Sequence, residues 1–147
     1  MSRQKNTTEV DINAVQTGVF GDYVLGDSGV TMQLGGRYGY PALLLSLIAP
    51  GFSLGYWDYQ GRLDYGPKIN HWTLNAFGAA DYIELEMDDP DGEIDEETGL
   101  VKQVMQELFR MDFHRLDLRY FRGDEKQYGD YRVALGYDRT RFDGEDY

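Results

Sequence analysis

The sequence predicts an α+β fold: a mainly antiparallel curved sheet, or a partly open barrel, of about eight short strands with one helix near residues 96–111. Many short runs alternate apolar and polar residues, which is the period of a strand with one covered face. The chain holds 12 Tyr and 18 Gly, and aromatic residues separated by glycine-containing turns are typical of short strands. One stretch instead spaces its apolar residues by three and four, which indicates the helix.

Length and composition indicate one globular domain over residues 1–147, with frayed ends at 1–8 and 140–147. The absence of Cys excludes a disulfide framework, a Cys-ligated metal and a thiol nucleophile. The first ten residues lack the apolar core of a signal peptide. The longest apolar run, 42–49, is far shorter than the roughly 20 residues of a membrane helix. We therefore expect a soluble, cytoplasmic protein that makes no membrane contact.

In the first third of the chain, alternation predicts a strand over 10–14 and a hairpin formed by 19–25 and 30–34. The glycine-rich segment 35–39 is expected to be a flexible connection. Segment 40–48 is apolar at nearly every position, which fits a strand buried on both faces or a short buried helix. Its length favours the strand.

Three further strands are expected in the middle of the chain. Alternation resumes over 52–56, and a second alternating run covers 69–77. In segment 83–87, apolar residues alternate with Glu84 and Glu86. This strand therefore has one apolar side and one side with a row of carboxylates.

The helix is predicted from Val101, Val104, Met105 and Leu108, which fall at positions i, i+3, i+4 and i+7. After it, the alternating runs 114–120 and 131–137 predict a second hairpin.

The charge of the chain is concentrated in the stretch from Asp81 to Leu100, which contains ten acidic residues and no Lys or Arg. It accounts for −10 of the formal net charge of −12. One interpretation is a solvated acidic loop. The other is a contact surface for a basic protein, because a row of carboxylates imitates a phosphate backbone. The residues proposed for this contact are Glu84, Glu86, Asp88, Asp89, Asp91, Glu93, Asp95, Glu96 and Glu97.

The spacing of Asp89, Asp91 and Asp95 matches part of a calcium-binding loop. In that register Met87 and Thr98 occupy two positions that require acidic ligands. We therefore expect no metal, with these three aspartates as the weaker alternative, and we expect no cofactor.

Tyr56, Trp57 and Tyr59 form a second candidate contact, because Tyr and Trp are common anchors of interfaces. The alternative is that they pack in a core. The two histidines, His71 and His114, lie in strand-like runs, and His114 shares a face with apolar residues, which favours a structural role.

These features favour a binding protein. No catalytic motif is present, so no enzyme activity is expected, and a net charge of −12 argues against direct nucleic-acid binding. The first hypothesis is an acidic inhibitor that covers the basic surface of a nucleic-acid-processing enzyme or defence complex, as a phage counter-defence or immunity protein does. The alternatives are a small-molecule-binding β-barrel and a structural subunit of a viral assembly. The oligomeric state is left open.

Overall fold

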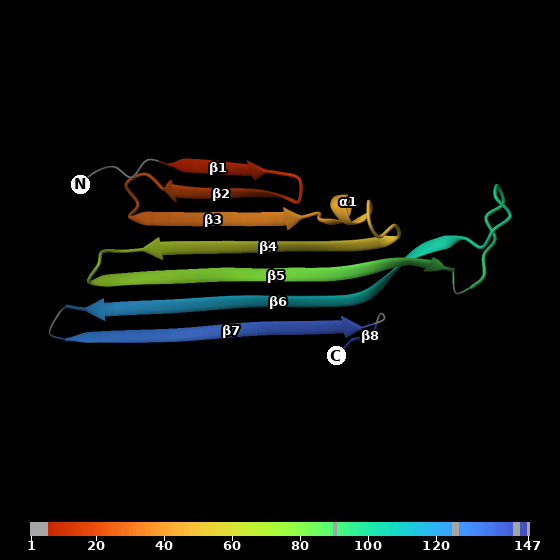
Figure 1. The fold of residues 1–147 in the computed structure, drawn as a ribbon. Coiled ribbons are helices and arrows are strands. Elements are labelled where there is room, and N and C mark those ends of the chain that lie inside the picture. Colours follow the sequence, from red (N-terminus) through yellow and green to blue (C-terminus); the bar gives the residue numbers. More distant parts are fainter. Residues whose placement is uncertain (1–5, 90, 125–126, 143–144, 147) are drawn as a thin grey trace.

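The protein forms a single antiparallel sheet in which every strand pairs with the next one along the chain (Figure 1). The computed structural model describes residues 6–89, 91–124, 127–142 and 145–146. Its elements are β1 Thr7–Ile12, β2 Gln16–Val24, β3 Val30–Gly39, α1 Ala42–Leu45, β4 Phe52–Tyr65, β5 Asn70–Asp88, β6 Gln103–Gly123, β7 Tyr128–Phe142 and β8 Glu145–Asp146. The sheet is open, because β1 and β7 lie at opposite ends of the strand order and β8 pairs only with the end of β7.

The expected antiparallel sheet and both expected hairpins are confirmed, as β2–β3 and β6–β7. The strands are longer than expected. The separate runs 69–77 and 83–87 belong to one strand, β5, of 19 residues, and β6 has 21 residues. The expected fraying of 1–8 and 140–147 falls partly outside the described residues, but residues 7–8 belong to β1 and residues 140–142 to β7.

The helix predicted over 96–111 is wrong, because residues from Gln103 onward form β6 and pair with β5. The pairing contains a β-bulge: Ile83 lies opposite Phe109 and Glu84 opposite Glu107, so Leu108 is an extra residue. This extra residue interrupts the period of two at Leu108, one of the four positions from which the helix was predicted. Pairing along the whole of β5 then outweighs the local helical pattern.

Two segments around β3 also differ from expectation. The strand expected over 40–48 is wrong, because Pro41 starts a short helix, α1, that connects β3 to β4. Leu47 and Ile48 beyond it are about 80 % and 81 % exposed, so this apolar run is not buried. The connection expected at 35–39 is part of β3, where a Cβ on Gly39 would lie 2.1 Å from the Tyr56 ring.

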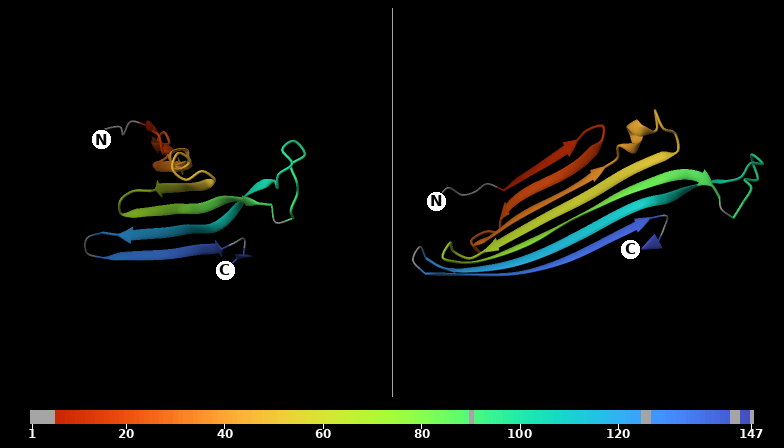
Figure 2. Two further views of the ribbon diagram at one scale, coloured as in Figure 1. Left: turned by 45° about the vertical axis from the view of Figure 1, so that its right-hand side comes forward. Right: turned by 60° about the horizontal axis from the view of Figure 1, so that its bottom comes forward.

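The described chain has one layer, without a hydrophobic core between layers (Figure 2). Ala80 is the only apolar residue of the described chain that is fully buried. The accessible surface is 11106 Å², whereas a compact monomer of this size exposes about 7,700 Å². No helix among the described residues is long and apolar enough to cross a membrane.

Candidate functional site

The strand register divides the sheet into two faces, because residues paired across antiparallel strands point to the same side. We define the apolar face as the side that carries Trp57. On β1 to β4 it carries Val10, Ile12, Val19, Tyr23, Val30, Met32, Leu34, Tyr38, Trp57, Tyr59, Leu63 and Tyr65. It continues on β5 to β7 with Trp72, Leu74, Ala76, Ala80, Tyr82, His114, Leu116, Leu118, Tyr120, Tyr131, Val133, Leu135 and Tyr137. Strands β1 to β4 contribute no charged side chain to this face.

The opposite side, the polar face, is held by ion pairs between arginine and aspartate. The pairs are Arg37–Asp58, Arg62–Asp64, Arg115–Asp138, Arg119–Asp130 and Arg132–Asp117. Most of them join neighbouring strands, and the Arg37 guanidinium lies 2.6 Å from the Asp58 carboxylate. The polar face therefore neutralises most of its own charge.

Hydrogen bonds lower the pKa of two carboxyl groups on the polar face, Asp64 and Asp130. The Arg62 guanidinium donates to Asp64, and Thr73 donates a further bond of 2.6 Å, so the pKa of Asp64 lies below its ordinary value despite partial burial. The bond from Arg119 likewise lowers the pKa of Asp130. These carboxylates are bound in their ionised form.

The polar face also contains open hollows. One of about 680 Å³ is lined by Glu9, Asp11, Phe20, Arg37 and Asp58, among others. A second, of about 570 Å³, is lined mainly by residues from β6 and β7. Neither hollow is lined by Trp57, Trp72 or a tyrosine, although aromatic residues are typical of small-molecule cavities.

An aromatic row crosses the apolar face near the β4–β5 and β6–β7 turns. Tyr65, Trp72, Tyr120 and Tyr131 lie directly opposite one another on four neighbouring strands. The Trp72 and Tyr120 rings stack with centroids 4.4 Å apart, and those of Tyr120 and Tyr131 are 6.3 Å apart. Such cross-strand aromatic pairs stabilise the sheet and also bring their polar tips to one level.

A second group, the aromatic cluster, consists of Trp57, Tyr59, His114 and Tyr137 on the same face. The Tyr59 hydroxyl lies 3.1 Å from His114 Nδ1, and the rings of Trp57 and Tyr137 are each 6.1 Å from the imidazole. Gly78 permits this approach, because a Cβ there would lie 2.6 Å from His114 Nδ1. His114 shares the face of Leu116 and Leu118, as its alternation predicts, but it is half-buried.

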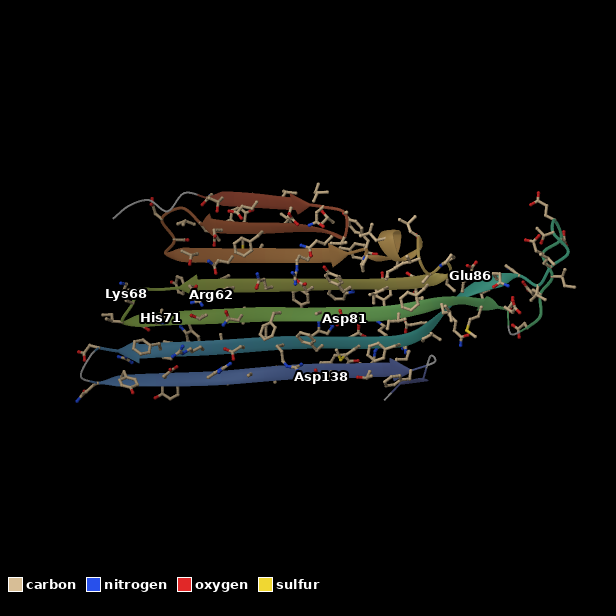
Figure 3. All side chains as sticks on the ribbon, viewed as in Figure 1. Arg62, Lys68, His71, Asp81, Glu86 and Asp138 are labelled. Atoms are coloured by element: carbon tan, nitrogen blue, oxygen red, sulfur yellow. The ribbon has the colours of Figure 1, made fainter. Side chains whose placement is uncertain are left out.

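Beyond the aromatic cluster the apolar face ends in charged residues. Asp112 is 5 % exposed. It lies 3.0 Å from Arg110 Nε and 3.1 Å from Arg139. On β5, Glu84 and Glu86 follow Tyr82 on this side of the strand. Figure 3 shows Glu86 at the far end of the sheet from Arg62, Lys68 and His71.

The acidic residues chosen from the sequence fall into two parts. Glu84, Glu86 and Asp88 belong to the end of β5, where Asp88 accepts a hydrogen bond from Gln103. The remaining ones belong to the acidic hairpin, which we define as residues 89 and 91–102 and which extends beyond the end of the sheet in Figure 1. Its members from the predicted set are Asp89, Asp91, Glu93, Asp95, Glu96 and Glu97.

The acidic hairpin is held by its own backbone and side chains. Ile94 and Val101 form a bridge, and the Lys102 backbone donates to Glu93. One oxygen of Asp95 accepts from the Glu97 and Thr98 backbones and from the Thr98 hydroxyl, which lowers the pKa of Asp95. Throughout the described ranges, no three acidic or histidine side chains gather in a way that suits a metal ion.

The three aromatic residues predicted as a second contact are divided between the two faces. Tyr56 lies on the polar face and donates a 2.7 Å hydrogen bond to Gln16, whereas Trp57 and Tyr59 lie on the apolar face. All three are half-buried. His71, on the polar face, stacks on Phe121 with ring centroids 5.1 Å apart.

Sequence reasoning missed the aromatic row and the ion pairs of the polar face. The alternation was visible, but the register that places Tyr65, Trp72, Tyr120 and Tyr131 in one line depends on pairing between distant segments. No family model matches the chain, and comparisons with curated proteins and with solved structures likewise found no match.

Proposed function

We propose that the protein is a structural subunit of a larger assembly in which a partner covers the apolar face. The observation that carries this proposal is the exposure of that face. Val133, Leu135 and Tyr137 on β7 are 65 %, 64 % and 53 % exposed, and Val10 and Ile12 on β1 are 66 % and 74 % exposed. A continuous apolar surface over seven strands is far larger than the exposed patches usual for monomers.

The area supports the same proposal. The described chain exposes 11106 Å², about 3,400 Å² more than a compact monomer of its size. A standard protein interface removes about 800 Å² from each partner. Burial of apolar surface contributes about 25 cal/mol per Å², so covering this face stabilises the assembled state.

The test is the size of the purified chain in detergent-free buffer, measured by light scattering after size exclusion. We expect the wild-type chain to self-associate and a mild detergent to reduce it to a defined smaller species. Leu135→Lys on the apolar face is expected to reduce self-association.

Ala134→Lys is the matched control, because Ala134 is the adjacent residue on the polar face, opposite Asp117. A stable wild-type monomer at high concentration, with both variants behaving alike, would contradict the proposal.

A second candidate function is the binding of a basic protein by the acidic hairpin, including the inhibitor role described above. It is favoured by the extension of the hairpin beyond the sheet and by the exposure of Asp91, Glu96 and Glu97. Among the acidic residues of the hairpin, Glu93 forms an ion pair with Lys102 at 3.3 Å, which offsets one negative charge. A field of this sign attracts basic partners and weakens with salt.

This candidate is tested with a labelled oligolysine peptide. We expect binding that weakens from about 50 to 500 mM salt and is lost in Asp91→Lys/Glu96→Lys/Glu97→Lys, which spares the turn-forming carboxylates of Asp89 and Asp95. Glu9→Lys/Asp11→Lys, on β1, is the control. If binding changes neither with salt nor with the hairpin substitutions, the hairpin is not the contact surface.

A further inference from the structure

We infer that the partner of the apolar face is lipid: the face contacts the acyl chains of a bilayer, and the polar face borders water. This inference rests on the proposed function, since it names what covers the same surface. It departs from the sequence-based expectation of no membrane contact, which considered apolar helices, whereas the surface in question is one side of a sheet.

The first support is the length of the uncharged runs on the apolar face. They extend from Val30 to Tyr38 on β3, from Ser53 to Tyr65 on β4, from Asn70 to Tyr82 on β5 and from Gly129 to Tyr137 on β7. Each run is about 9 to 13 residues long, and a strand crosses a bilayer with about 9–11 residues. On β6 the run is shorter, from His114 to Tyr120.

The second support is the order of polarity along the strands. Between the aromatic row and the aromatic cluster lie only aliphatic side chains and glycine, such as Leu63, Leu74, Leu118 and Leu116. On β4 to β7, the hydroxyl, indole and imidazole groups of the face lie in the two aromatic groups or beyond them, as at Tyr82. The two groups are six residues apart on β4, or about 20 Å. Tyr and Trp in strands that cross a bilayer gather at its two interfaces in this way, and charged residues begin beyond them.

The same order argues against a second protein layer. A protein interface carries about one hydrogen bond per 100–200 Å², distributed across its area. On β4 to β7 the aliphatic part of this face has no side-chain donor or acceptor, so it complements a medium that has none. On these strands the two aromatic groups lie where a bilayer has its interfacial layers.

The backbone meets the main condition for contact with hydrocarbon, because the sheet hydrogen bonds satisfy the inner strands. The outer edges of β1 and of most of β7 have no partner strand in the described chain. Lipid contact therefore requires further strands at these edges, and in a preparation of this chain alone other copies supply them.

The experiment is the refolding of the full chain from denaturant into phosphatidylcholine vesicles, with acyl chains brominated at different depths as fluorescence quenchers. We expect the Trp emission to shift to shorter wavelength and to fall at least twofold with brominated lipid. Trp57 and Trp72, studied singly as W72F and W57F, should be quenched more strongly by bromines near the headgroup than by bromines near the chain ends.

Two depth probes sharpen the test in a background that carries both W57F and W72F. Leu118→Trp places the probe in the aliphatic part of the apolar face, and we expect the strongest quenching by bromines near the chain ends. Phe77→Trp is the control on the polar face, opposite Gln60 and Arg115, and we expect quenching by aqueous iodide instead. The wild-type result stands on its own if either variant fails to fold.

The outcomes separate this inference from the proposed function. A closed oligomer in buffer that is dissociated by Leu135→Lys and is not quenched by brominated lipid would make a second copy the partner; the lipid inference then fails and the assembly proposal stands. A chain that stays monomeric and binds neither vesicles nor detergent would overturn both the lipid inference and the assembly proposal. Equal quenching of Leu118→Trp and Phe77→Trp by lipid also overturns the inference.

Discussion

Asp117 and Leu135 lie close together in the β6–β7 pairing, yet their surroundings are opposite. Asp117 on the polar face is 7 % exposed because Arg132 reaches across from β7 to pair with it. Leu135 on the apolar face keeps 64 % of its surface exposed. The polar face pairs most of its charges within the sheet, whereas no second layer of the described chain covers the apolar face. This difference is the basis of the proposal that a partner covers the apolar face.

The largest change in stability is expected at Gly78, where the apolar face is closely packed. Gly78→Ala should destabilise the fold by about 2–3 kcal/mol, because the new Cβ overlaps His114 Nδ1 and the Phe113 carbonyl oxygen, each 2.6 Å away. Gly61→Ala, also in a strand of this face, has its nearest atom at 3.4 Å and should change stability by less than about 0.5 kcal/mol. Urea unfolding in mild detergent measures the stability of both variants. An equal loss of stability in the two would show that the aromatic cluster does not restrict position 78.

The next effect concerns the polar face. Asp117→Ala should cost about 2 kcal/mol, because it removes a nearly buried carboxylate and its bond from Arg132. Asp138→Ala breaks a similar pair with Arg115, but the Asp138 side chain is 66 % exposed, so the expected cost is below about 1 kcal/mol. The same unfolding measurement compares them; a larger loss for Asp138→Ala would contradict the idea that burial determines the value of these pairs.

A smaller effect is expected from acid. The pKa of Asp64 is lower in the folded chain than in the unfolded chain, chiefly because of the hydrogen bond from Arg62. The folded state therefore binds fewer protons, so this contribution is complete above the unfolded pKa of about 3.9 and is lost as the pH falls through the folded pKa. Asp64→Asn should flatten the loss of stability below about pH 4, measured by urea midpoints.

Asp27→Asn, in the exposed turn between β2 and β3, is the control for the acid experiment. If the stability of Asp64→Asn falls with acid as steeply as that of the wild type, then carboxyl groups other than Asp64 determine the pH dependence of stability.

The smallest effect is local to the apolar face. The hydrogen bond with Tyr38, whose hydroxyl is 3.1 Å away, raises the pKa of Tyr82 to about 12. Tyr38→Phe should lower the pKa of Tyr82 towards its ordinary value of about 10, as followed by NMR of ring-labelled tyrosine. Tyr40→Phe, which loses bonds to the Asn13 and Gln16 carbonyls instead, should leave that titration unchanged.

Local patterns predicted the parts of the fold that neighbouring residues determine. The turn at 26–29 and the alternation on both sides of it identified the β2–β3 hairpin, and 131–137 identified β7. The prediction failed near 103–111, where the bulge at Leu108 imitates helical spacing. It also failed at 40–48, where an all-apolar run suggested burial but forms a connection at the end of the sheet. Near 103–111 the deciding contacts are the strand pairs with β5, whereas α1 is held by hydrogen bonds within its own segment.

The sequence by itself determined that the strands have one apolar and one polar side, because side chains alternate along any extended strand. It also determined the position of the acidic stretch from Asp81 to Leu100. Only the tertiary structure decided which residues share a line across the strands and that no second layer of the described chain covers the apolar side. Register and layering arise from hydrogen bonds between segments far apart in the chain, and a single-strand pattern does not contain them.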